Sequence, residues 1–206
     1  MRCLLTLLMS VVSLYVFADN EELYRSLDEA IVQAPDFVKK REQRINVIKQ
    51  RLQKVTDDGE RYQLTCSLFN EYMPYKSDSA AKYVYEAILL AEKRGNKSDL
   101  CLTRSLLAFL CSSTGQYVES RRILDSTDIS GVDREAIGQY YKSLTHVYGE
   151  MAYYSNIPKL KNEFFAKQEE YTEKIYEILT PSHDFYLQCK EQGCYKKGDI
   201  EGALRL

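Results

Sequence analysis

Two short segments decide the fold: GQYVESRRIL at residues 115–124 and GDIEGALRL at residues 198–206. Each starts with a glycine, has an aromatic or aliphatic residue two positions later, and has a small residue five positions after the glycine. The recurring positions are Gly115, Tyr117 and Ser120 in the first segment, and Gly198 and Ala203 in the second. The glycine predicts a turn before an amphipathic helix, and the small residue predicts a close approach of two helices.

The small position returns at a regular interval along the chain. Ser120 and Ala203 lie 83 residues apart, which is two periods of about 41 residues. Ala80, followed on the same helical face by Ala87, lies 40 residues before Ser120. The remaining position of this series falls near Asn162. Such a period, with one helix pair per repeat, predicts a helical-hairpin solenoid in which each pair buries its apolar side against its neighbours.

The rest of the chain has the periodicity of amphipathic helices. No segment shows sustained alternation of apolar and polar residues, so we expect an all-α protein. Nine glycines and four prolines in 206 residues are too few for a β-sandwich with a turn every roughly 8–12 residues. We expect Asp78 and Ser182 to cap two helices, and Asp133 to open a third. After residue 57, the predicted helices cover residues 60–72, 78–94, 98–114, 116–125, 133–154, 158–180 and 182–197.

The first 18 residues predict a secretory signal peptide. Arg2 precedes an apolar run of 15 residues, and Val16 and Ala18 occupy the −3 and −1 positions of a cleavage site. The run is shorter than the roughly 20 apolar residues that span a bilayer as a helix, so an uncleaved anchor is the less favoured alternative. We therefore expect a mature protein that is exported to the periplasm.

Two further regions follow the predicted signal peptide. Residues 19–57 carry two apolar helical faces separated by Pro35, which predicts an N-terminal helical hairpin. Residues 58–206 predict the helical repeats. The last repeat is incomplete, because Leu206 follows Ala203 by three residues, within the first turns of a helix that needs roughly ten more to cover its partner. We expect a truncated product or fragment, with a short frayed terminal helix as the alternative.

The two opening segments resemble the turn and second-helix start of tetratricopeptide repeats, whose usual form is close to G-D-Y-x-E-A-L. The period here is longer than the usual roughly 34 residues. Over about residues 20–206 the chain also resembles the amino-terminal sensor region of Bacteroides-type exported tetratricopeptide regulators. The stretches that carry this resemblance are ELYRSLDEAI, KKREQRINVIKQRL, ERYQLTCSLFNEYMPYKSDSA, LLAFLCSSTGQYVES and HVYGEMAYYS. The resemblance implies further repeats, a transmembrane helix and a regulator-like cytoplasmic segment in a full-length relative.

Five cysteines follow the predicted signal peptide: Cys66, Cys101, Cys111, Cys189 and Cys194. An odd number in an oxidising compartment leaves at least one thiol unpaired or paired between chains. Cys101 and Cys111 lie on one predicted helix about 15 Å apart, so they cannot form a disulfide with each other. We expect most of the five to be buried free thiols, although the sequence does not decide their pairing.

Few residues indicate chemistry. His146 and Glu150 share a helical face, but a zinc site needs a third and a fourth ligand, so we expect a hydrogen-bonded pair and no metal. His183 and Asp184 follow Pro181, where helix capping accounts for both. The sequence has no G-x-S-x-G, P-loop or G-x-G-x-x-G motif, so we expect neither an enzyme nor a cofactor. A formal net charge of −2 removes the electrostatic argument for direct nucleic-acid binding.

Tyrosine is the unusually frequent residue, with 17 in 206. Five tyrosines gather around His146 in the sequence: Tyr140, Tyr141, Tyr148, Tyr153 and Tyr154. In one interpretation they complete the rim of the core, with their rings buried and their hydroxyls in water. In the other, they line a concave face that grips an extended peptide or a sugar by aromatic contact. The sequence leaves both interpretations open.

These observations favour a non-catalytic periplasmic interaction module with a protein or peptide partner. The resemblance implies that it is the sensing part of a membrane-anchored regulator. The alternative is an outer-membrane-associated protein that binds glycans or nutrients, but such proteins carry a lipid-attachment cysteine, and none follows Ala18. Membrane association is expected only if the signal peptide stays uncleaved or the full-length chain continues. The ligand and the oligomeric state are not determined by the sequence.

Overall fold

The computed structural model describes the backbone of residues 2–206 and the side chains of residues 21–195 and 197–206. This described part is built from α-helices and contains no strand. The chain divides into two compact units, Met1–Val47 and Ile48–Leu206. The all-α expectation is therefore confirmed. Among the described helices, none combines the length and the apolar character needed to cross a membrane.

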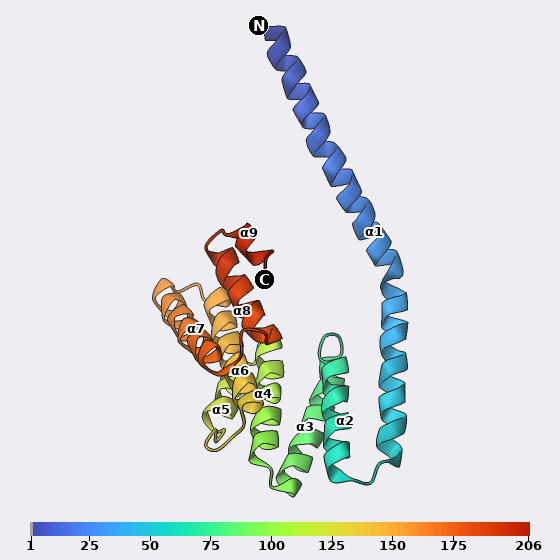
Figure 1. Ribbon diagram of the computed structural model, residues 1–206, viewed down its shortest axis with the longest axis vertical. Helices are drawn as coiled ribbons and strands as arrows, with labels where there is room; N and C mark the ends of the chain where they lie inside the picture. The colour runs from blue at the N-terminus through green and yellow to red at the C-terminus, as the bar shows by residue number, and fades with distance from the viewer. Residues whose placement is uncertain (1) are drawn as a thin grey trace. The chain divides into compact units, whose positions relative to one another are not determined.

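The first unit consists of helix α1 (Arg2–Lys54), which continues into the second unit (Figure 1). The hairpin expected over residues 19–57 is wrong, because Pro35 lies inside α1 instead of ending it. Proline removes one helical hydrogen bond, but the turns on both sides keep theirs. The apolar face predicted there is exposed, with Leu23 at 67% and Ile31 at 61% of full exposure.

The predicted signal peptide at residues 1–18 lies outside the described side chains. Its cleavage after Ala18 therefore stays a prediction.

The second unit contains four successive helix pairs. Each helix packs on its chain neighbour, and α4 packs also on α6, so the pairs follow one another in chain order (Figure 1). The seven helices predicted after residue 57 begin and end within two residues of their predicted limits. They are α2 (Asp58–Tyr72), α3 (Ser77–Arg94), α4 (Lys97–Ser113), α5 (Tyr117–Asp125), α6 (Arg134–Tyr154), α7 (Pro158–Ile178) and α8 (Asp184–Lys196). The short helix α9 (Ile200–Ala203) follows them.

The helix caps agree only in part with prediction. Asp133 lies at the start of α6, as expected, and it is the cap, since its carboxylate accepts a 2.9 Å hydrogen bond from the Ala136 amide. Asp78 is not a cap: α3 begins one residue earlier, after Lys76, and Asp78 lies in the first turn. There its negative charge is stabilised by the helix dipole. The cap of α8 is His183 instead of Ser182, and its Nδ1 accepts a 3.1 Å hydrogen bond from the Phe185 amide.

The two repeated glycines form the same turn. Gly115 has φ +81° and Gly198 has φ +74°, a left-handed conformation that strains any residue with a Cβ. In each turn the amide after the glycine bonds back to a helix carbonyl, from Gln116 to Cys111 at 2.8 Å and from Asp199 to Cys194 at 2.9 Å. Tyr117 is the first residue of α5. The repeated sequence segments thus have the same local structure.

The three small residues occupy equivalent places on the second helix of three pairs. Ala80, Ser120 and Ala203 are buried, and the amide of each donates a hydrogen bond to the carbonyl of the N-cap residue of its helix, four positions earlier. Ala87 lies on the same buried face of α3 as Ala80. In α7 the equivalent residue is Lys161, one position before the residue predicted from the period. This third pair therefore departs from the small-residue rule.

In the third pair, α6 and α7 approach closely because of small residues on α6, the first helix of the pair. Gly149 of α6 faces α7 so closely that a Cβ at this position would lie 2.6 Å from Nε2 of Gln168. Gly138, also on α6, approaches Leu179 in the same way, at 2.8 Å from its Cδ2 atom. The small residue has moved from the second helix of the pair to the first, which the repeat pattern does not indicate.

All five described cysteines are free thiols, as expected for most of them. Cys101, Cys111 and Cys189 are buried, whereas Cys66 and Cys194 are half-buried. Cys189 belongs to a small core with Ile175 and Leu179, where α7 meets α8. The thiols thus fill the helix interfaces as small apolar groups.

Candidate functional site

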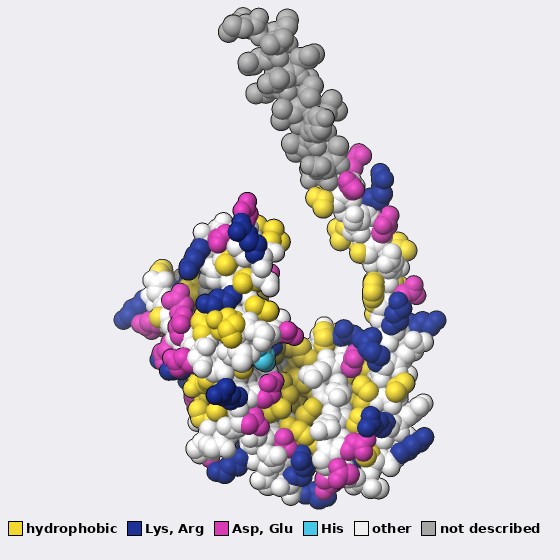
Figure 2. Space-filling model, viewed as in Figure 1, with side chains coloured by type: hydrophobic (Ala, Val, Ile, Leu, Met, Phe, Trp, Pro, Cys, Tyr) yellow, Lys and Arg dark blue, Asp and Glu magenta, His cyan; other side chains and the backbone are white. Residues whose placement is uncertain are grey.

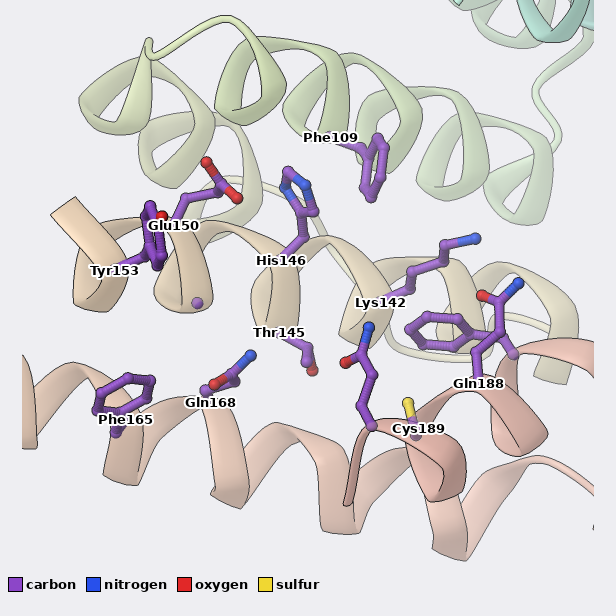
Figure 3. Close-up of a pocket in the computed structure, with 13 residues that line it drawn as sticks. Phe109, Lys142, Thr145, His146, Glu150, Tyr153, Phe165, Gln168, Gln188 and Cys189 are labelled. Atoms are coloured by element: carbon purple, nitrogen blue, oxygen red, sulfur yellow. The ribbon is translucent and has the colours of Figure 1, made fainter. Parts of the chain in front are cut away.

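A pocket of about 460 Å³ opens between α4, α6, α7 and α8. Helix α6 supplies one wall, and aromatic and amide side chains of the other helices supply the rest (Figure 3). The lining residues are Phe109 from α4, Lys142, Thr145, His146, Gly149, Glu150 and Tyr153 from α6, Phe165 and Gln168 from α7, and Phe185, Gln188, Cys189 and Gln192 from α8. Its volume is in the range of small-molecule sites.

The wall from α6 follows from helical geometry. Its six residues are spaced three or one positions apart, so they fall on one face of the helix. The buried residues Leu144 and Val147 occupy the remaining directions and hold α6 in the core. One helix thus presents a polar stripe to the pocket while its other sides are packed.

His146 has a defined hydrogen-bond partner at the edge of the pocket. Its Nδ1 lies 2.8 Å from Oγ of Ser112, and that hydroxyl donates a hydrogen bond to the Phe109 carbonyl at 2.9 Å. Because the single hydroxyl proton is used there, we assign the imidazole proton to Nδ1, which leaves Nε2 as an acceptor. Burial, together with the charge of Lys142, lowers the pKa of His146 and favours this neutral form.

The predicted pairing of His146 with Glu150 is therefore wrong. The packing of α6 on α4 brings Ser112 to the imidazole, and the sequence gives no sign of this contact. Glu150 lines the pocket one turn away. Among the described residues, no group of three or more His, Cys, Asp or Glu side chains could hold a metal ion.

Lys142 lies between two aromatic rings. Its Nζ is 4.6 Å from the centre of the Phe185 ring and 5.7 Å from that of Phe109. The side chain is half-buried, and burial lowers the pKa of its ammonium group. The nearby Glu135 has its contact elsewhere, since its carboxylate lies 3.7 Å from Nε2 of His183.

The five tyrosines do not form one surface. Tyr148 is only 6% exposed and stacks on Tyr171 of α7, with 5.6 Å between ring centres. Tyr141 also stacks on Tyr171, with 6.1 Å between ring centres. Tyr140 donates a 3.4 Å hydrogen bond to the Leu124 carbonyl, and burial raises its pKa to about 12. These three tyrosines belong to the helix packing, which favours the core interpretation for them.

The other two tyrosines are exposed at the end of α6. Tyr153 and Tyr154 are 73% and 63% exposed, and their rings meet edge to face with 5.0 Å between centres. Tyr153 lines the pocket, whereas Tyr154 does not belong to its lining. Only one of the five candidate tyrosines therefore contributes to this site.

Sequence reasoning did not identify most of the pocket. Lys142, Thr145 and Gly149 were recognisable in principle, because they lie on the helical face that holds His146 and Tyr153. The three phenylalanines and three glutamines come from α4, α7 and α8, and only the packing of these helices brings them to α6. No local motif marks those residues.

The comparisons with known proteins identify a family of repeat domains. No curated protein and no solved structure matches the chain. Residues 31–206 match the family described as the SusR N-terminal TPR domain, where TPR denotes the tetratricopeptide repeat. The match covers all the repeat positions and the whole pocket, and it confirms the resemblance carried by the repeated segments. The chain therefore belongs to the family of SusR N-terminal TPR domains.

Proposed function

We propose that the protein is a non-catalytic periplasmic module that binds a protein or peptide partner and serves as the sensing part of a membrane-anchored regulator. The observation that carries this proposal is the match to a SusR N-terminal TPR domain over residues 31–206. Tetratricopeptide repeats are helical-pair arrays, and their extended faces generally bind other proteins.

The pocket supplies a place for such recognition. The first helices of three successive pairs, α4, α6 and α8, all contribute to its lining. In helical solenoids, the surface formed by equivalent helices of successive repeats is the usual binding face. On the face of the described residues that Figure 2 shows, charged side chains of both signs lie over the repeat helices.

The proposal is tested by site-specific photo-crosslinking in the organism that encodes the chain. A photoreactive phenylalanine analogue replaces Tyr153, which lines the pocket, and in a control variant it replaces Tyr154, which is similarly exposed but outside the lining. We expect the Tyr153 variant to capture one defined protein or peptide much more strongly than the control. The chain should be found in the periplasmic fraction with Asp19 as its first residue.

Other outcomes would contradict this function. Equal adducts from both positions would show that the pocket does not select the partner. A cytoplasmic chain that retains residues 1–18 would exclude export. Calorimetric binding of neutral glycans without any captured protein would support the glycan-binding alternative. The regulator role further predicts that the reading frame continues past codon 206 with more helices and a membrane span.

A further inference from the structure

Lys142 is a cation placed in the wall of a pocket without a carboxylate partner among the described residues. Its Nζ lies between the faces of Phe109 and Phe185, and Glu135, the carboxylate that attracts it, is in contact with His183. Phenyl rings replace only part of the hydration that an ammonium group loses on burial. A negatively charged group in the pocket would supply the counter-charge that the Lys142 ammonium group lacks.

Thr145 adds a second unsatisfied group in the same wall. Its hydroxyl is buried and has no hydrogen-bond partner among the described residues. Most helical threonines of this chain, including Thr65, Thr103 and Thr172, donate to the carbonyl four residues earlier. The Thr145 hydroxyl forms no such bond, and Figure 3 shows its side chain directed away from α4. An unpaired buried hydroxyl is expected to gain from a partner that enters the pocket.

Two side chains that follow Lys142 along α6 offer hydrogen-bond acceptors. Nε2 of His146 is an acceptor in the assigned tautomer, and the Glu150 carboxylate lies eight residues from Lys142, about 12 Å along α6. These groups accept hydrogen bonds from hydroxyl groups, and Glu150 repels a second anion. The arrangement thus orients a ligand that is acidic at one end and hydroxylated at the other (Figure 3).

We propose that this pocket is a binding site for a small hydroxylated carboxylate, with a sugar acid as the simplest example. The ligand carboxylate binds the Lys142 ammonium group beside Phe109 and Phe185, and its hydroxyls donate to His146 and Glu150. The amides of Gln188 and Gln192 line the same space and both donate and accept hydrogen bonds. This site goes beyond the partner binding proposed above, because it needs no second protein.

The test uses isothermal titration calorimetry of the purified chain with three probes. Glucuronate carries the carboxylate and the hydroxyls, glucose replaces the carboxylate with a hydroxymethyl group, and cyclohexanecarboxylate keeps the charge but lacks the hydroxyls. We expect glucuronate to bind at least ten-fold more tightly than either of the other two probes. Equal binding of glucuronate and glucose, or no binding of glucuronate, would overturn the proposal.

Two variants locate the binding. Lys142→Met keeps the length of the side chain and removes its charge, and should weaken glucuronate binding about 10- to 100-fold, the usual effect of a hydrogen bond to a charged group. Lys190→Met is the matched control, because Lys190 also lies over two rings, 4.1 Å from the centre of Tyr176 and 5.6 Å from that of Tyr186, but lines no part of this pocket. Unchanged binding in Lys142→Met would overturn the proposal, as would an equal loss in both variants.

A conservative variant distinguishes the effect of the lost charge on binding from an effect of the substitution on folding. Lys142→Arg keeps the positive charge, and it should retain more glucuronate affinity than Lys142→Met at equal helical content by circular dichroism. Failure of partner crosslinking with intact glucuronate binding would refute the proposed function alone. Intact crosslinking without glucuronate binding would refute this inference alone.

Discussion

The hydroxyl of Ser120 on α5 donates a 2.7 Å hydrogen bond to the carbonyl of Ala108 on α4, and both residues are fully buried. This contact joins the two helices of the second pair at the small position that recurs along the chain. Since Ala108 lies inside α4, the Ser120 hydroxyl is an additional donor to a helical carbonyl. The small residue thus contributes a hydrogen bond as well as space.

Ser120 variants are expected to separate these two contributions. Ser120→Ala removes the hydrogen bond and should lower the free energy of unfolding by about 1 kcal/mol. Ser120→Leu also inserts volume into a packed interface and should cost about 1–3 kcal/mol more. Urea unfolding followed by circular dichroism measures both. The control Ser113→Ala, at an exposed site on α4, should change stability by less than about 0.5 kcal/mol; an equal effect at both sites would contradict the role of Ser120.

The turn glycines and a helical glycine should respond in opposite directions to alanine. Gly115→Ala forces a Cβ into a left-handed conformation and should destabilise the protein by about 1–2 kcal/mol. Gly193→Ala lies in α8 with no atom within 4 Å of the new Cβ, and should stabilise it by about 0.4–1 kcal/mol. Thermal unfolding compares the two variants. A stabilising Gly115→Ala would show that the turn differs from the one described.

The pKa of His146 is expected to lie below the usual value of about 6.5. As the pH falls below 6.5, the unfolded state binds the proton first. The contribution of His146 to stability is therefore complete above about pH 6.5 and is lost as the pH falls toward the folded-state pKa. An NMR titration of the histidine Cε1 protons, assigned with His146→Gln, measures this pKa directly.

Lys142→Met provides an internal check of that assignment. Because the Lys142 ammonium group lowers the pKa of His146, removing its charge should raise this pKa. A titration midpoint at or above 6.5 in the unaltered protein, or one that does not move in Lys142→Met, would contradict the described surroundings of the imidazole.

The thiols should react in an order set by exposure and pKa. Cys194 is half-buried and should be alkylated first at pH 8. Cys66 should follow, since burial raises its pKa to about 11. Cys101 is fully buried and its pKa is also raised to about 11, so it should react only on unfolding. Timed iodoacetamide labelling and peptide mass spectrometry give the order. Rapid labelling of Cys101 in the folded protein would contradict its burial.

Local sequence predicted most of the helices because their limits are set by local signals. Gly115 forms the turn after α4 by its backbone freedom, and Asp133 caps α6 by a hydrogen bond to an amide of the first turn. The prediction of an N-terminal hairpin failed, because the local signal of one proline did not end the helix. Pro35 weakens a helix but does not end α1, and the apolar periodicity on both sides of it indicated two faces without indicating what they pack against.

The sequence by itself determined the helical class, the order of the helices and the positions of the repeated small residues. Periodicity, turn glycines and caps act over a few residues, so each can be recognised from a short stretch of sequence alone. Only the tertiary structure decided which tyrosines are buried, which serine bonds His146, and which rings enclose Lys142. Those contacts join residues that belong to different helices, and they form only when whole helices pack against each other.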